Sequence, residues 1–301
     1  MKLPWGELLK EEPMLRIKQI IWNIRVLVLN KLRLVDQRTV YFEGGLGSQV
    51  LAYIEYNERN KSSNKPIFAN LDYFKNIEND FIDETGLSRW TWKLDQYGIY
   101  RHELKELTKI KKLINKYFKV RQQSNTEIFY NFKEKKSDIY QKIFAINNED
   151  VKKYLLEKFR SDKGDFAMIH IRRGDYLNVA SKVVSTEELI KFVNKIKKLL
   201  PENILISSDS LLPASEKDLF SNSFVEFNLV YIDPQEDPVR VHNLMRSSTV
   251  LVASNSTFSF TAGLLAKSGC MVFFPTNYFG QNRASDSRSF VFRQPFEFLV
   301  T

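Results

Sequence analysis

The sequence has very few of the side chains that form disulfides or bind metals. Its 301 residues include one cysteine, Cys270, and three histidines. A single cysteine excludes an intrachain disulfide, and no Cys/His cluster has the spacing of a zinc site. We therefore expect a protein that needs no metal and works in a reducing compartment, the cytoplasm.

Long uncharged apolar runs are also missing. Charged residues and prolines interrupt the first 13 positions, where a signal peptide would carry its apolar segment. Residues 14–34 are apolar-rich but contain five basic side chains, whereas a membrane-spanning helix needs roughly 20 nearly uncharged residues. Two interpretations of this basic helix stay open. It packs on the first domain, or it lies peripherally on the inner face of the plasma membrane with its Lys and Arg residues toward anionic headgroups.

The balance of charge is strongly basic. The net charge is +9, and 43% of the residues are hydrophobic, which is enough for packed cores. A basic surface favours anionic partners, namely nucleic acid, nucleotide phosphates or an anionic membrane. Charge alone does not choose among the three.

Residue patterns predict an α/β protein. The length suggests two domains of roughly 150 residues. From about residue 155 onward, buried-type strands alternate with helices, which indicates a parallel sheet covered on both faces. The strands are expected at 165–171, 203–207, within 225–232, at 249–253 and at 271–274, and the helices at 185–200, 213–220, 238–246 and 258–267. Earlier in the chain we expect strands at 39–43 and 66–70 and a basic amphipathic helix at 101–120.

A glycine-rich turn follows the first predicted strand. Gly44–Gln49 has the sequence Gly-Gly-Leu-Gly-Ser-Gln, and its glycines allow a sharp turn and a close approach to a ligand. The N–H groups of the helix that follows favour negative charge. The loop lacks the Gly-Lys-Ser/Thr of a Walker motif and the third glycine of a dinucleotide fingerprint. A purely structural turn is the alternative interpretation.

Two adjacent arginines end the predicted strand at 165–171. They belong to the run His170–Tyr176, with the sequence His-Ile-Arg-Arg-Gly-Asp-Tyr. Arginine forks match phosphate oxygens, and buried arginines need anions. His170 and Arg172 alternate and so share one face of the strand, whereas Arg173 points the other way, toward an acid such as Asp175. The alternative is a structural Arg–Asp network.

Two further loops follow predicted strands. Ser254–Thr257 has hydroxyls and free N–H groups at a helix start, which suits a diphosphate, with simple N-capping as the alternative. Ser207–Ser210 contains Asp209, which could accept hydrogen bonds from a base or a ribose or could stabilise an ordinary turn. In parallel sheets such loops meet at the carboxyl ends of the strands.

Together these loops resemble those of the α-1,2-fucosyltransferases of glycosyltransferase family 11. That family's Gly-Gly-Leu-Gly-Asn-Gln loop is matched except at Ser48, and its His-x-Arg-Arg-Gly-Asp-Tyr motif is complete. Its Ser-Asp loop recurs at Ser208–Asp209, and its Ser-Asn-Ser-Ser/Thr-Phe-Ser segment at Ser254–Ser259, where Phe260 and Thr261 replace two tryptophans. The sequence has no Asp-x-Asp pair of the kind that metal-dependent sugar transferases use to hold a cation.

The resemblance implies a GT-B-like fold, with two Rossmann-type domains whose parallel sheets face a central cleft. It implies an inverting transfer from a GDP-fucose donor to a glycan acceptor, without a metal or other cofactor. We expect a basic extension at 1–38, an acceptor-side domain at 39–155 and a nucleotide-sugar domain at 156–301. The lipid-linked acceptor of a surface polysaccharide would suit a membrane-touching enzyme.

The resemblance also implies roles for individual residues. Arg172 stabilises the leaving diphosphate, and Asp175 or Glu43 is the candidate base. The expected donor contacts are Gly45, Gly47, Gln49, His170, Arg173, Asp209, Asn255, Ser256 and Thr257. The alternatives are a different GDP-sugar donor in the same fold and, from another class, a basic nucleic-acid-binding protein. We expect no nucleic-acid partner, because the basic residues are scattered and no recognition module is evident.

Overall fold

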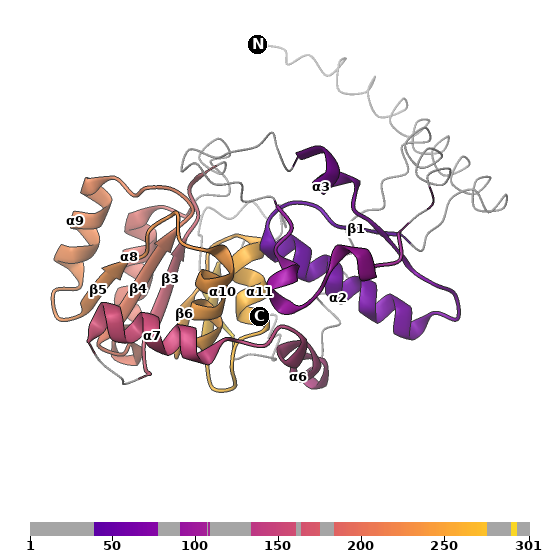
Figure 1. Ribbon diagram of the computed structural model, residues 1–301. Helices are drawn as coiled ribbons and strands as arrows, with labels where there is room; N and C mark the ends of the chain where they lie inside the picture. The colour runs from indigo at the N-terminus through magenta and orange to yellow at the C-terminus, as the bar shows by residue number, and fades with distance from the viewer. Residues whose placement is uncertain are drawn as a thin grey trace, which may run out of the picture.

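The computed structural model shows an α/β protein with two parallel sheets (Figure 1). It describes residues 39–77, 91–106, 108, 134–160, 164–174, 184–275 and 290–293. The basic segment at 14–34, and with it the predicted extension, lies outside the described residues. Within the described part, no helix has the length and apolar character that a membrane span requires.

Six strands form the larger sheet, in the order β5-β4-β3-β6-β7-β8. Neighbouring strands are parallel, as the alternation of strands and helices predicts, except that β8 pairs antiparallel with β7. The pattern did not predict β8. The strands are β3 (Ala167–Ile171), β4 (Asn203–Ser208), β5 (Asn228–Tyr231), β6 (Val250–Val252), β7 (Met271–Pro275) and β8 (Phe290–Arg293).

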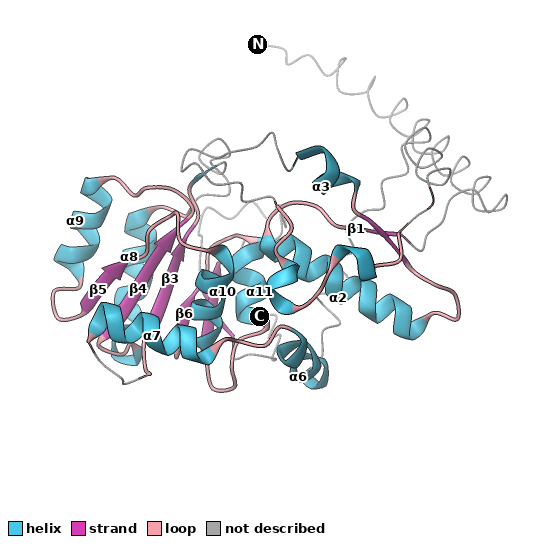
Figure 2. Ribbon diagram, viewed as in Figure 1, coloured by secondary structure: helices cyan, strands magenta, loops and turns pink. Residues whose placement is uncertain are grey.

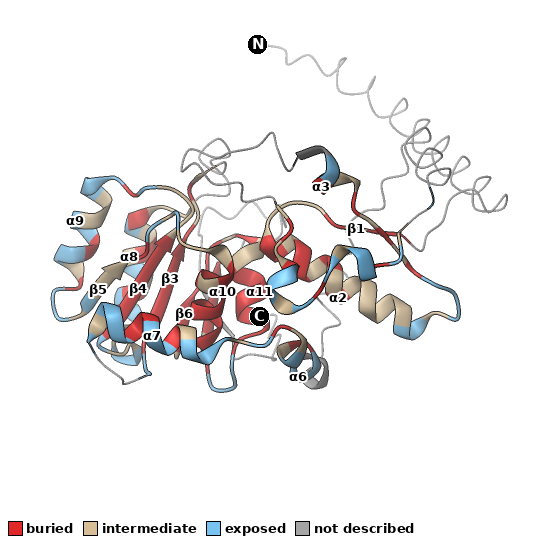
Figure 3. Cartoon of the chain, viewed as in Figure 1, coloured by how far each residue is buried: buried red, intermediate tan, exposed pale blue. Residues whose placement is uncertain are grey.

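Helices cover both faces of this sheet. On one face, α8 (Thr186–Lys195) and α9 (Ala214–Ser223) contribute Leu189, Val193 and Phe220 to a core with alternate residues of β3 and β4. On the other face, α7 (Asn148–Phe159), α10 (Pro238–Ser247) and α11 (Thr257–Leu264) complete a second core. A turn of 3₁₀ helix, η5 (Lys197–Leu199), precedes β4. Because both faces are covered, all five residues of β3 are buried (Figure 3).

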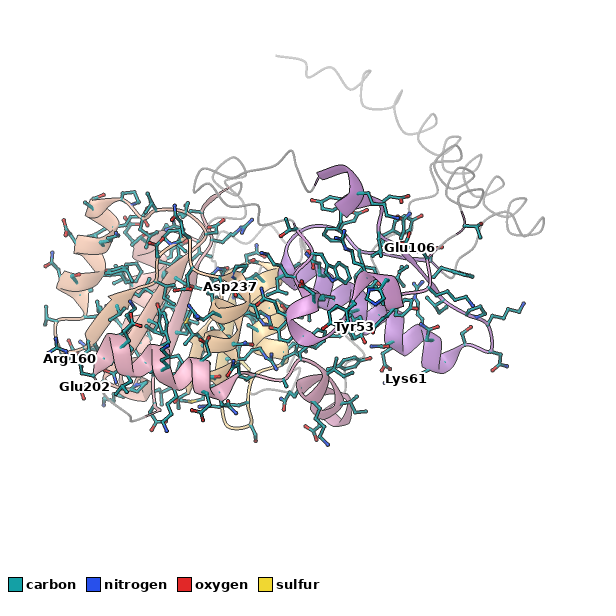
Figure 4. All side chains as sticks on the ribbon, viewed as in Figure 1. Tyr53, Lys61, Glu106, Arg160, Glu202 and Asp237 are labelled. Atoms are coloured by element: carbon teal, nitrogen blue, oxygen red, sulfur yellow. The ribbon has the colours of Figure 1, made fainter. Side chains whose placement is uncertain are left out.

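Local signals fix where these helices begin. Ser185 and Glu188 form the predicted capping box at the start of α8. The carboxylate of Asp237, labelled in Figure 4, accepts a hydrogen bond from the Val239 N–H and caps α10, with Pro238 in the first turn. These caps supply partners for N–H groups that no preceding turn can satisfy.

The earlier part of the chain forms a smaller unit. Strands β1 (Thr39–Tyr41) and β2 (Phe68–Asn70) pair in parallel, joined by α2 (Leu46–Ser62). Phe42 packs against Trp92, and Trp92 packs against Phe74, in its aromatic core. The other elements are α3 (Asp72–Ile77), the 3₁₀ turns η1 (Leu94–Tyr97) and η2 (Arg101–Glu103), and α6 (Glu134–Ile143).

The predicted helix at 101–120 is wrong at its beginning. After η2 the chain is extended, and Glu106 bridges to Ala69 of β2, with the Ala69 N–H donating to the Lys105 carbonyl at 2.8 Å. This parallel contact satisfies the free side of β2, and it overrides the helical periodicity of Leu104 and its neighbours. Residues 109–120 lie outside the described part of the chain.

The smaller unit packs directly on α10 and α11. Its core includes Val239 of α10 and Leu265 just after α11. Helix α2 begins beside α11 and then runs away from it (Figure 1). The predicted boundary between residues 155 and 156 falls inside α7, whose Val151, Tyr154 and Leu155 belong to the core of the large sheet.

Candidate functional site

The loops after β3 and β6 meet at the carboxyl edge of the large sheet. Strand β3 lies between β4 and β6, so the connections from β3 and β6 leave in opposite directions (Figure 2). Ligands bind at this kind of switch point in open parallel sheets. An open hollow lies here, and its lining includes His170, Arg172, Arg173, Ser254 and Asn255.

His170 joins the two loops. Its ring is 4% exposed, and its Nδ1 lies 2.7 Å from the Ser254 hydroxyl. The Ser259 hydroxyl in turn lies 3.2 Å from that of Ser254 and donates to the Ser254 carbonyl. The Phe258 ring packs on His170 with centroids 5.6 Å apart. His170 therefore fixes the loop that begins α11 while it lines the hollow.

Arg172 is oriented by Asp209. Their Nη1 and Oδ2 atoms are 2.9 Å apart, and the two side chains are 23% and 6% exposed. Asp209 Oδ1 also accepts the Arg173 N–H at 2.6 Å. Gly174 has φ +26° and no room for a Cβ beside the Asp209 carboxylate. The Asp209 carboxylate thus holds the loop after β3, and its contact with a base or ribose stays a prediction.

Arg173 contributes to the lining of the hollow and is bound to residues of α8 and α9. Its guanidinium donates to Glu216 Oε2 at 2.9 Å, to Thr186 Oγ1 at 2.7 Å and to the Val184 carbonyl at 3.0 Å. Although burial raises the pKa of Glu216, the hydrogen bonds from Arg173 and Thr186 lower it overall. The contact of Arg173 with the donor stays a prediction. Arg173 ties the loop to α8 and α9, and its carboxylate partner is Glu216, where the sequence suggested Asp175.

The side-chain amide of Gln49 is hydrogen-bonded to the backbone. Its side chain is buried and donates to the carbonyls of Gly44 and Thr91 at 3.0 and 2.8 Å, while its Oε1 accepts the Lys93 N–H at 2.9 Å. These bonds hold the glycine loop against the segment before η1. Gln49 therefore supports the loop, and its contact with the donor stays a prediction.

The glycine loop lies against the start of α11. A Cβ on Gly47 would be 2.5 Å from the Phe258 nitrogen and 2.6 Å from the Thr257 carbonyl carbon. The Ser48 and Thr257 hydroxyls are 3.3 Å apart. Gly45 is the N-cap residue of α2, and neither α2 nor α11 has an acidic residue in its first turn. Two helix starts, each favourable to an anion, are thereby in contact.

Ser256 caps α11 with its side chain. Its hydroxyl accepts from the Phe258 N–H at 3.2 Å, the N-capping role that the sequence left open as an alternative. Thr257 and Asn255 are both partly exposed beside it. Asn255 lines the hollow, and the capped start of α11 follows it directly in the chain.

Of the two candidate bases, only Glu43 is among the described residues. Asp175 lies outside the described residues. Glu43 lies next to Tyr73, whose pKa is raised by burial and by Glu43 and lowered by a hydrogen bond with Gly44. In the described part of the chain, no three His, Cys, Asp or Glu side chains gather closely enough to hold a metal ion.

Sequence reasoning missed the supports beneath the loops. Glu216 lies 43 residues from Arg173, and no motif links them. His242 and Arg246 are buried on α10. Their i, i+4 spacing on one helix face was a signal that could have marked a polar cluster.

Comparisons with known proteins point to one family. The chain matches no curated protein. A crystal structure of POFUT1 in complex with GDP aligns with 38% of this chain and 42% of its own, at 14% identity and a TM-score of 0.31. The aligned part is thus less than half of that chain, and a score this low does not establish a shared fold.

The model of the family Glycosyl transferase family 11 matches residues 77–294, more than half of the sequence. The match contains His170–Tyr176 and Ser254–Thr257, while the glycine loop precedes it. The chain therefore belongs to glycosyl transferase family 11, as these motifs predicted.

Proposed function

We propose that the protein transfers fucose from GDP-fucose to a hydroxyl of a glycan acceptor, with inversion and without a metal. The α-1,2 linkage to a galactose-type residue follows from the family resemblance. One observation carries the proposal. The family match includes the loops after β3, β4 and β6, and these loops converge where Arg172 and His170 line the hollow.

The chemistry is a single displacement. The acceptor oxygen forms a bond to the anomeric carbon as the bond from that carbon to the GDP oxygen breaks. Negative charge grows on the leaving diphosphate, and the acceptor proton passes to a base. Arg172, oriented by Asp209, and the N–H groups at the start of α11 stabilise the leaving group more strongly in the transition state.

Asp175 and Glu43 are the residues we propose for the base. Proton abstraction by a side chain contributes about 10²–10⁴ to the rate. Each is tested by its amide variant, Asp175→Asn and Glu43→Gln, through the pH–rate profile. The variant whose pH–rate profile loses its acidic limb identifies the base. If both variants keep the acidic limb, neither residue is the base.

The finer architecture is also a proposal. In a GT-B-like arrangement, the smaller unit would bind the acceptor opposite the donor loops of the large sheet. The contact between Gly47 and the start of α11 supports it, because it places the glycine loop beside the helix that follows Ser254 and Asn255 of the hollow. If such a cleft closes on its ligands, adding GDP and an acceptor should change the shape of the protein in small-angle scattering. An unchanged shape would contradict closure of the cleft.

We place the reaction at the cytoplasmic face of the plasma membrane, on the lipid-linked acceptor of a surface polysaccharide. The basic, apolar-rich segment at 14–34 supports this placement. Deletion of residues 1–34 should abolish flotation with anionic vesicles. Flotation that persists after the deletion would exclude this segment as the anchor.

The direct test is a transfer assay in EDTA. We expect release of GDP from GDP-fucose that depends on a β-galactoside acceptor, with a product whose new linkage is assigned by NMR. Transfer from GDP-mannose instead of GDP-fucose would show that the protein is a glycosyltransferase with a different donor sugar. Absence of transfer from every GDP-sugar tested would contradict the proposal.

A further inference from the structure

A polar cluster lies buried where the smaller unit meets α10 and α11. It contains Tyr97 from η1, His242, Asn243 and Arg246 from α10, and Thr261 from α11. His242 and Thr261 are 0% exposed and Arg246 is 1% exposed. Buried polar groups persist when each has a partner, so the bonds of this cluster are informative.

The central bond of the cluster joins Thr261 to His242. The Thr261 hydroxyl donates to the carbonyls of Thr257 and Phe258, each at 3.0 Å. The same hydroxyl lies 3.1 Å from His242 Nε2, and the direction of that bond depends on the tautomer of the imidazole. Because the two carbonyls already take the one hydroxyl proton, we assign the proton of the neutral imidazole to Nε2.

The other side of His242 faces Tyr97. The Tyr97 hydroxyl lies 3.5 Å from His242 Nδ1 and 3.3 Å from Asn243 Oδ1, and it is also hydrogen-bonded to Arg246. Burial raises the pKa of Tyr97 to about 12 despite the nearby Arg246 cation. Burial, with a smaller effect from Arg246, holds the pKa of His242 well below 6.5. The tyrosine is thus a donor and the histidine neutral at physiological pH.

The chain of bonds ends at the candidate site. Thr257 is the first residue of α11 and contacts Ser48 of the glycine loop. The Phe258 ring contacts His242 on one side, with centroids 5.4 Å apart, and His170 on the other, at 5.6 Å. Displacing His242 would therefore move both the first turn of α11 and the ring that supports His170.

We propose that His242 is a positioning residue for the donor site. Its Nε2–H, bonded through Thr261, holds the first turn of α11 in the orientation that receives the diphosphate, and Tyr97 links that orientation to the smaller unit. The proposal rests on the proposed function, because it assumes a nucleotide at this loop. His242 itself does not touch the donor.

Calorimetry with GDP tests the role with two substitutions of His242. His242→Gln keeps an N–H donor near the position of Nε2, and we expect its affinity to stay within about twofold of the wild type. His242→Phe keeps a ring beside Phe258 but loses the donor, and we expect roughly tenfold weaker GDP binding, the loss of one buried hydrogen bond. His102→Phe, at an exposed histidine, is the matched control and should bind GDP like the wild type.

Thr261→Val supplies a second route if His242→Phe does not fold. It removes the same bond from the other end, so the double variant with His242→Phe should bind GDP about as weakly as either single variant. A His242→Phe protein that melts at a lower temperature yet binds GDP normally would show a merely structural role and overturn the proposal. Full additivity in the double variant would also overturn it.

Failure of the positioning role can be distinguished from failure of the proposed function. If the wild type itself does not bind GDP, the proposed function is wrong, and the positioning role is wrong with it. The ¹⁵N shifts of His242 then still test the bond, because a neutral ring with its proton on Nε2 is expected whether or not GDP binds. A proton on Nδ1 in a GDP-binding wild type would overturn the inference while leaving the function intact.

Discussion

Replacing Gly47 with alanine would place a methyl group 2.5 Å from the backbone nitrogen of Phe258, where ordinary contact begins at 3.4 Å. The difference, 3.4 − 2.5, means that α2 and α11 must separate by about 0.9 Å. The neighbouring atoms are backbone, so no flexible side chain can relieve the clash. Overpacking of this kind lowers the free energy of unfolding by about 1–3 kcal/mol. A shift near 1 Å at a reacting site can lower the rate about 10²-fold.

Urea unfolding and the initial rate of GDP release would measure the two effects. Gly164→Ala is the matched control, because a Cβ there meets nothing within 4 Å and its φ is not in the positive region. We expect the control to equal the wild type or to be stabilised by about 0.4–1 kcal/mol. A Gly47→Ala protein with wild-type stability and turnover would refute the close contact between the glycine loop and α11.

Further substitutions test the supports of the loop after β3. Asp209→Asn should lower the free energy of unfolding by about 1–3 kcal/mol, because it weakens the charged hydrogen bonds to Arg172 and to the Arg173 N–H. The measurement is the midpoint of urea unfolding, with Asp218→Asn at an exposed position as the control. Equal midpoints for the two variants would contradict the prediction. Glu216 has a lowered pKa, so its bonds to Arg173 stabilise the fold above the unfolded pKa near 4.5 and are lost as pH falls through the folded value. Thermal melts of Glu216→Gln should therefore lose less stability on acidification than the wild type, and parallel curves would count against the pairing.

The larger sheet could be predicted because its strands have a local signature. The run Ala167–Ile171 is apolar apart from one residue, and a helical pattern with the Ser185 capping box follows it. Alternation of such strands and helices leaves little choice but a parallel sheet with covered faces. Strand β8 was missed because its antiparallel pairing with β7 depends on where the chain returns in space.

The loops of the site were predictable, and the partners of their side chains were not. The motif places Arg172 and Arg173 directly after β3, and both line the hollow although they pair with different carboxylates. Glu216 meets Arg173 from α9, and Asp209 meets Arg172 from the loop after β4, so each pairing depends on how two elements pack. The helix expected at 101–120 failed at its start for a similar reason. Glu106 reaches the edge of β2, and a tertiary contact outweighs local propensity.

In the proposed reaction, the loops around Arg172 bind the diphosphate of a GDP-sugar without a metal. Calorimetry of GDP and GDP-fucose in EDTA, with the wild type and Arg172→Ala, measures this binding. We expect the wild type to bind both ligands and Arg172→Ala to lose affinity for both by about tenfold or more, the loss of a charged hydrogen bond. Equal affinities in the two proteins, or no binding by the wild type, would contradict it.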